Sequence, residues 1–169
     1  MQRFALLLFI VTVVGSTVYA LATGQDLPVV MPSHFGHGEA DSYMPRSGYL
    51  TFFVCLVAGV PLFIAGAAAL LVRNAPQIAR GQNAQFWDEN RELAVEYVTS
   101  RTLILCAVLS LFLAAVHHMV VRANRVRPPA LPFPDFPILL GGFVVLFFVL
   151  AIAFGLGMNR MARAGRFDD

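Results

Sequence analysis

Four long apolar runs without a charged side chain set the strictest limit on what this chain can fold into. They cover residues 4–21, 48–72, 102–121 and 136–158. Each run is about 20 residues or longer, which at 1.5 Å of helical rise per residue covers the roughly 30 Å hydrocarbon layer of a bilayer. Because a helix satisfies its own backbone hydrogen bonds in lipid, the runs predict four membrane-spanning helices.

The composition agrees with a membrane protein and excludes some functions. The chain is 58% hydrophobic and only 13% charged, whereas a soluble domain carries about 25% charged residues. Its 12 basic residues are all arginines scattered at the ends of the apolar runs, so a nucleic-acid partner has no support. The four runs contain no Asp, Glu, Lys or Arg, the residues that form proton relays and ion pathways in membranes. This absence argues against a proton-coupled transporter or an ion pump.

We therefore expect an all-α, four-helix bundle made of a single integral membrane domain, residues 1–169. We expect the helices at about residues 4–22, 48–72, 101–121 and 137–159. Between them we expect an ordered outer loop at 23–47, a cytoplasmic loop at 73–100 and an outer proline-rich loop at 122–136. The lipid bilayer is the first partner that this arrangement implies.

The distribution of arginines predicts the orientation. With the N-terminus inside, eight arginines lie on the cytoplasmic side and four on the outer side. This bias favours a bacterial inner-membrane protein with both termini in the cytoplasm. The first run also allows a second interpretation, a secretory signal peptide, because Arg3 and an apolar core precede Ala20-Leu21-Ala22. Its length and the position of Tyr19 near its end favour a retained helix.

The cytoplasmic loop contains a segment with helical periodicity. Residues 84–101 hold no glycine or proline, and apolar residues recur near helical spacing with charged residues between them. The pattern predicts an amphipathic helix on the membrane surface, which could continue into the third span. The helix could simply connect two spans, or Trp87 and Arg91 could form a cytoplasmic surface for a protein partner.

The main polar segment between two spans is the outer loop LPVVMPSHFGHGEADSYMPR, residues 27–46. Its prolines restrict the backbone and its glycines permit tight turns, so the loop should be an ordered cap. His34 and Asp41 could hydrogen-bond across such a turn and close it, or could present a small polar site to a ligand. The candidate residues for ligand binding or for stapling the loop are Pro32, His34, Phe35, Gly38, Asp41 and Arg46.

All four histidines fall on the predicted outer side. His34 and His37 lie in the loop, while His117 and His118 lie near the outer end of the third span. Zinc or copper needs three or four converging ligands of this kind, so an extracytoplasmic metal site is one hypothesis. Neighbouring residues on a helix point about 100° apart, so one of His117 and His118 at most would join it easily. The other hypothesis is that these histidines are structural and bond the loop backbone.

Residues 5–72 resemble a membrane domain of unknown function that forms the N-terminal part of SdpI-type immunity proteins. The similarity rests on the pattern Leu27-Pro28, Pro32-Ser33-His34-Phe35 and Gly38-Glu39-Ala40-Asp41, followed by a basic residue and a long helix. Arg46 stands where the family has a lysine. The segment from Trp87 is similar to an uncharacterised bacterial subgroup, and the Gly-Tyr-Arg-Thr type motif of the second half of SdpI proteins is absent. The resemblance implies a retained first helix.

These observations favour a non-enzymatic sensor or immunity-type protein that uses the outer loop. The resemblance implies a link between a secreted toxin outside and a readout in the cytoplasm. Two alternatives stay open. One is an extracytoplasmic metal-binding protein or metal-dependent membrane enzyme, and the other is an accessory subunit of a larger membrane complex.

Overall fold

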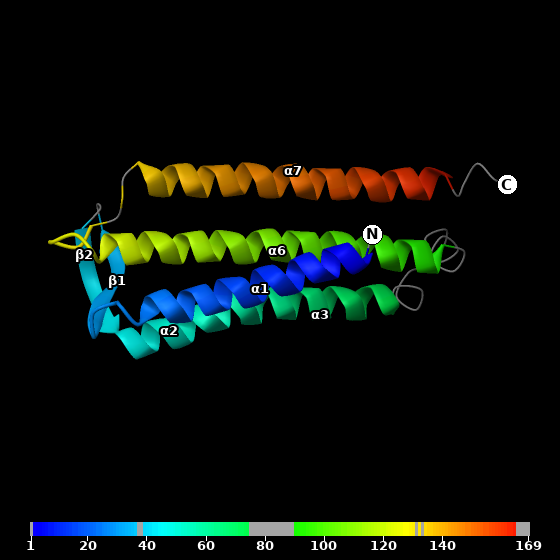
Figure 1. The fold of residues 1–169 in the computed structure, drawn as a ribbon. Helices are drawn as coiled ribbons and strands as arrows, with labels where there is room; N and C mark the ends of the chain where they lie inside the picture. The colour runs from blue at the N-terminus through cyan, green and yellow to red at the C-terminus, as the bar shows by residue number, and fades with distance from the viewer. Residues whose placement is uncertain (1, 37–38, 75–89, 131, 133, 165–169) are drawn as a thin grey trace.

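The computed structural model describes residues 2–36, 39–74, 90–130, 132 and 134–164. Its elements follow the chain as α1 (Gln2–Gly24), β1 (Val30–Gly36), β2 (Glu39–Pro45), α2 (Arg46–Val54), the π-helical turn η1 (Cys55–Gly59), α3 (Val60–Arg73), α6 (Arg91–Ala123) and α7 (Asp135–Ala164). Figure 1 shows the helices side by side, with the two strands at one end of the bundle.

Four helical segments of the described chain are long and apolar enough to cross a membrane. They are α1, the continuous segment Arg46–Arg73 formed by α2, η1 and α3, then α6 and most of α7. The prediction of four helices long and apolar enough to cross a membrane is therefore confirmed. The start of α1 and the end of α7 both lie at the end opposite the strands, as an even number of spans requires.

Helix α6 is the centre of the bundle. It packs against α1 and α3 along most of its length, and α7 lies on its other side. Helix α7 touches α6 at three levels, through the ion pair Arg122–Asp135, the stacked rings of Phe112 and Phe143 and the hydrogen bond from Tyr97 to the Phe154 carbonyl. The core of the protein therefore lies among α1, α2, α3 and α6.

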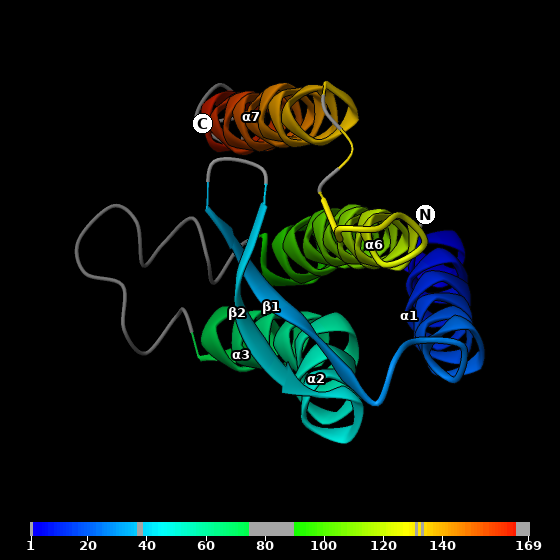
Figure 2. The same ribbon diagram turned by 90° about the vertical axis from the view of Figure 1, so that its left-hand side faces the viewer.

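The loop between α1 and α2 contains a β-hairpin, which adds two strands to the predicted all-α fold. Strands β1 and β2 pair antiparallel, with Val30 opposite Pro45 and Phe35 opposite Ala40, and the register shifts near His34. The hairpin lies across the end of the bundle, roughly perpendicular to the helices (Figures 1 and 2). Both strands are edge strands, so the prolines in them can face the unpaired side without breaking the ladder. The sequence predicts an ordered cap with tight turns at these residues, but it does not predict the two strands.

The second span contains a local distortion with a clear cause. Pro61 has no N–H to give to the carbonyl of Val57, four residues earlier, and the π-helical turn η1 immediately precedes it. The buried hydroxyl of Ser110 in α6 donates to the Val57 carbonyl at 3.2 Å. A side chain of the neighbouring helix thus bonds a carbonyl that proline leaves without its α-helical donor.

We expect Ser110→Ala to lower the free energy of unfolding by about 1 kcal/mol, because a buried carbonyl loses a donor. Thermal or denaturant unfolding in detergent micelles measures this. Ser100→Ala is the matched control, since Ser100 is equally buried in α6 but bonds only the Tyr97 carbonyl of its own helix. Equal losses in the two variants would contradict the role assigned to Ser110.

The predicted amphipathic helix lies partly outside the described residues. Helix α6 begins at Arg91 and runs unbroken to Ala123, so the second half of the predicted segment does continue into the third span. Residues 84–89, including Trp87, belong to the part that the structure does not describe. Arg91 is exposed at the start of α6, where its guanidinium donates to the Arg73 carbonyl at 3.4 Å. A partner surface there stays a prediction.

Candidate functional site

Three helices meet at the buried ring of His117 beneath the hairpin. His117 is fully buried in α6. Its Nε2 lies 2.8 Å from the hydroxyl of Thr23 at the end of α1, and its Nδ1 lies 2.8 Å from the hydroxyl of Tyr49 in α2. Both nitrogens of a buried imidazole therefore have partners, as burial of a polar group requires.

The hydrogen bonds of Thr23 identify which nitrogen carries the proton. The Thr23 hydroxyl donates its single hydrogen to the Tyr19 carbonyl at 2.8 Å. It must then accept from His117, so the ring is protonated at Nε2. Nδ1 is left as an acceptor, and the Tyr49 hydroxyl donates to it. A neutral His117 in this tautomer satisfies every group of the cluster.

Aromatic rings surround the same histidine. Tyr49 and Phe53 stack with ring centroids 5.5 Å apart, and the Phe53 centroid is 5.0 Å from that of His117. Tyr19 meets His117 edge to face. The next residue, His118, points elsewhere: it is exposed, and its Nδ1 lies 2.7 Å from the Tyr19 hydroxyl. The two adjacent histidines thus have different environments.

The hairpin is anchored in this core. Met31 of β1 is fully buried, and Leu27 just before the strand is 4% exposed. They belong to one cluster of buried side chains from the hairpin segment, α1, the second span and α6, namely Ala20, Leu27, Met31, Tyr49, Phe53, Val57 and Val121. Any displacement of Met31 would therefore disturb side chains that contact His117.

The opposite side of the hairpin carries an exposed polar pair. His34 Nδ1 lies 2.7 Å from Asp41 Oδ1, and the two side chains are 69% and 50% exposed. This is the contact across the turn that the sequence predicts. Of the other candidate residues in the strands, Pro32 is buried and Phe35 is half-buried. Gly38 lies outside the described residues.

Arg46 ties the two ends of the hairpin together. Its Nη1 donates to the carbonyls of Gln25 and Leu27 at 2.6 and 2.9 Å, and its backbone N–H donates to the carbonyl of Val29. The basic residue expected after the loop therefore holds the strand that enters the hairpin beside the helix that leaves it.

Arg46→Gln should lower the free energy of unfolding by about 1 kcal/mol and speed hydrogen exchange in the hairpin, since two charge-assisted bonds are lost at a half-buried site. Unfolding in micelles and mass-spectrometric exchange measure the two effects. Arg125→Gln removes the same charge from an exposed side chain at the same end of the bundle. It should leave the free energy of unfolding and the hydrogen exchange of the hairpin unchanged. Slow exchange in the hairpin of Arg46→Gln would contradict this role.

The histidines do not gather into one site among the described residues. There, no three His, Cys, Asp or Glu side chains come close enough to hold a metal. His117 is occupied by two hydroxyl groups, His118 pairs with Tyr19 and His34 pairs with Asp41. His37 lies outside the described residues, so a zinc or copper site that includes it stays a prediction.

Sequence reasoning missed the partners of His117. Thr23, Tyr49 and Phe53 were not singled out, although a signal exists. Tyr19 and Thr23 are one turn apart at the end of the first run, and Tyr49 and Phe53 are one turn apart at the start of the second. Tyr19 and Thr23 on the first span and Tyr49 on the second place hydroxyl groups at the same end of two spans, which indicates a shared polar partner, and His117 is at that end of the third.

Comparison with known proteins finds a match for the first part of the chain only. Residues 6–58 match the family model described as Domain of unknown function (DUF1648). No curated protein and no solved structure matches the chain. The matched stretch holds most of α1, the hairpin, α2 and most of η1, so it includes Thr23 and Tyr49 but not His117. Thr23 and Tyr49 therefore lie within the stretch that is similar to DUF1648, and α6 supplies His117 from outside it.

Proposed function

We propose that this protein is a non-enzymatic sensor or immunity-type protein of the bacterial inner membrane. In this proposal the hairpin receives a secreted peptide or toxin outside the cell, and the bundle carries the response to the cytoplasmic end. The observation that supports it best is the two-sided hairpin. One side offers the exposed His34–Asp41 pair, and the other inserts Met31 into the core around Tyr49 and His117.

The exposed side of the hairpin suits recognition of a polar ligand. His34 and Asp41 together present a donor and an acceptor. Replacing the bond between them by bonds to a ligand costs little free energy, because both side chains are well exposed to water. A peptide that bonds either group would change how the strands sit. The proposal places this side outside the cytoplasm, with both termini inside, on the basis of the arginine distribution.

The buried side suits transmission to the other end of the membrane. Met31 packs in the cluster that holds Tyr49, and Tyr49 donates to His117 of α6. Helix α6 has 33 residues, about 50 Å at the helical rise, and its first residue, Arg91, lies at the end far from the hairpin. A ligand shifts this bundle only by as much as its affinity differs between two arrangements, so the hairpin must move when the ligand binds.

Deletion of the gene in the source bacterium, followed by complementation, tests the proposal. Loss of the gene should raise sensitivity to at least one member of a panel of secreted antimicrobial peptides. The wild-type gene should restore resistance, and the double variant His34→Ala, Asp41→Ala should not. Gln25→Ala is the control, because the exposed Gln25 contributes its backbone carbonyl rather than its side chain to the hairpin contacts described above. Unchanged sensitivity in the deletion strain would contradict the proposal.

No observation on the described residues favours the alternatives. A metal-dependent enzyme has no three-ligand cluster there to build on. The exposed apolar surface of α7 suits a helix bordered by lipid chains as well as one bordered by another subunit, so an accessory role stays a prediction.

A further inference from the structure

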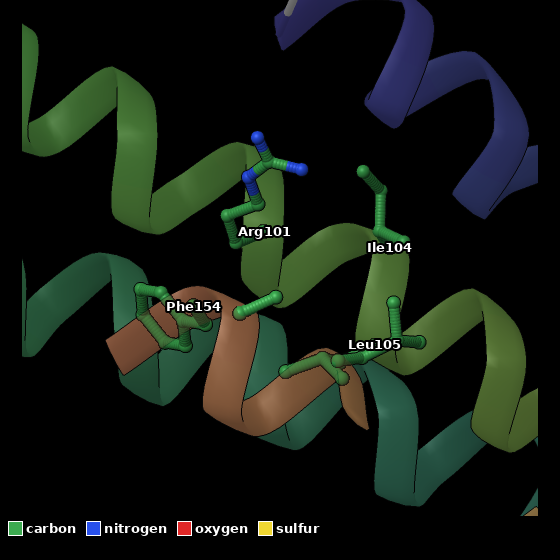
Figure 3. A pocket seen from close by; sticks show the side chains of 6 residues that line it. Arg101, Ile104, Leu105 and Phe154 are labelled. Atoms are coloured by element: carbon green, nitrogen blue, oxygen red, sulfur yellow. The ribbon is translucent and has the colours of Figure 1, made fainter. Parts of the chain in front are cut away.

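A pocket lies between α6 and α7 near the end of the bundle opposite the hairpin. Its volume is about 90 Å³, and Figure 3 shows its lining side chains. Five of them are apolar and one is charged: Ile104, Leu105, Leu150, Ala153, Phe154 and Arg101. None is acidic. A single arginine in an apolar pocket between two membrane-spanning helices needs an explanation.

Arg101 has unused hydrogen-bonding capacity. Its Nε is buried and has no hydrogen-bond partner among the residues that the structure describes. The guanidinium carbon lies 5.2 Å from the centroid of the Tyr97 ring, a cation–π arrangement that fixes the group without using its N–H donors. A buried donor without an acceptor is unfavourable, and an anionic acceptor would bind it most strongly.

Neighbouring contacts join α6 to α7 beside the pocket. The Tyr97 hydroxyl donates to the Phe154 carbonyl of α7 at 3.2 Å, and the two rings are 5.8 Å apart. A Cβ at Gly157 would collide with the Tyr97 hydroxyl, so only glycine permits this approach. The spacing of α6 and α7 is therefore built into the sequence at the level of Arg101.

Part of the lining follows the order of chemical groups in a phospholipid. Arg101 is nearest the start of α6, at the membrane border. Ile104 and Leu105 on α6, and Leu150 on α7, lie about one turn farther toward the hairpin, in the hydrocarbon layer. Arg101 and Phe154 thus lie at the headgroup level, and Ile104, Leu105 and Leu150 lie at the acyl-chain level.

We propose that this pocket binds an anionic phospholipid, with the phosphate on the Arg101 guanidinium and an acyl chain against the apolar lining. Basic pockets between spans on the cytoplasmic side are suited to such headgroups. This site is independent of the hairpin and of the function proposed for it. The bound lipid fills space between α6 and α7 and supplies the acceptor that Arg101 Nε needs.

Native mass spectrometry of the full chain tests the site, with phosphatidylglycerol or phosphatidylcholine added to the detergent-purified protein. Arg101→Gln should reduce bound phosphatidylglycerol by about fivefold, the loss expected for one arginine at the membrane surface. Arg3→Gln removes the same charge at the same end but does not line the pocket, and should bind like the wild type. Phosphatidylcholine should bind more weakly than phosphatidylglycerol to the wild type.

A second variant keeps the test decisive if Arg101→Gln fails to fold. Ala153→Leu fills the pocket while keeping Arg101, and should also lower phosphatidylglycerol binding, with its elution on gel filtration unchanged. Three results would each overturn the proposal. They are equal binding by Arg101→Gln and Arg3→Gln, equal binding of the two lipids, and displacement of phosphatidylglycerol by millimolar inorganic phosphate.

Discussion

Replacing His117 by alanine should lower the free energy of unfolding by about 2–4 kcal/mol. The substitution leaves the buried Tyr49 hydroxyl without its partner, removes one of the two hydrogen bonds of Thr23 and opens a cavity against the Phe53 ring. Each unsatisfied buried group costs about 1–3 kcal/mol, and membrane surroundings moderate that figure. Denaturant unfolding in micelles, followed by circular dichroism, measures the loss.

The adjacent histidine provides the control for this experiment. His118 is exposed and has one hydrogen bond, to the Tyr19 hydroxyl, so His118→Ala should cost less than about 1 kcal/mol. If the two variants were equally stable, the enclosed cluster would have no special role. Tyr49→Phe combined with His117→Ala extends the test, because a double-mutant cycle isolates the energy of their hydrogen bond.

The second large effect concerns the anchoring of the hairpin. Met31→Ala should cost about 2–4 kcal/mol, since truncation of a fully buried side chain loses apolar contacts and leaves a cavity. Hydrogen exchange in both strands should rise at the same time, because Met31 is the fully buried side chain of β1 in the bundle core.

Val30 is the matched control for Met31. It is the neighbouring residue of the same strand, and it is 58% exposed because successive side chains of a strand point to opposite faces. Val30→Ala should therefore change stability by less than about 0.5 kcal/mol. Strands that exchange no faster in Met31→Ala than in Val30→Ala would show that the hairpin is held by its backbone alone.

The spans could be predicted because a bilayer imposes a length and a polarity on every helix within it. The expected second span, 48–72, lies inside the helical segment Arg46–Arg73. The hairpin could not be predicted by the same reasoning. Its strands alternate poorly, contain prolines and shift register, so their pairing depends on Met31 and Leu27 finding the core rather than on a local pattern.

Part of the candidate site was visible in the sequence. His34 and Asp41 are seven residues apart across a turn, so a local contact was a natural expectation, and the structure places them 2.7 Å apart. The His117 cluster joins residues 68 and 94 positions apart. Contacts of that separation depend on the rotation of three helices about their axes, which four uniformly apolar runs do not reveal.

The attachment of α7 makes the bilayer a partner in the tertiary structure. Asp135 and Phe154, which connect α7 to α6 at its two borders, are 19 residues apart, about 28 Å along a helix. This length is close to the thickness of the hydrocarbon layer. A thinner or thicker membrane would strain the contacts of Asp135 and of Phe154 with α6 at the same time. The length of the lipid chains should therefore change the stability of the packing of α7 against α6.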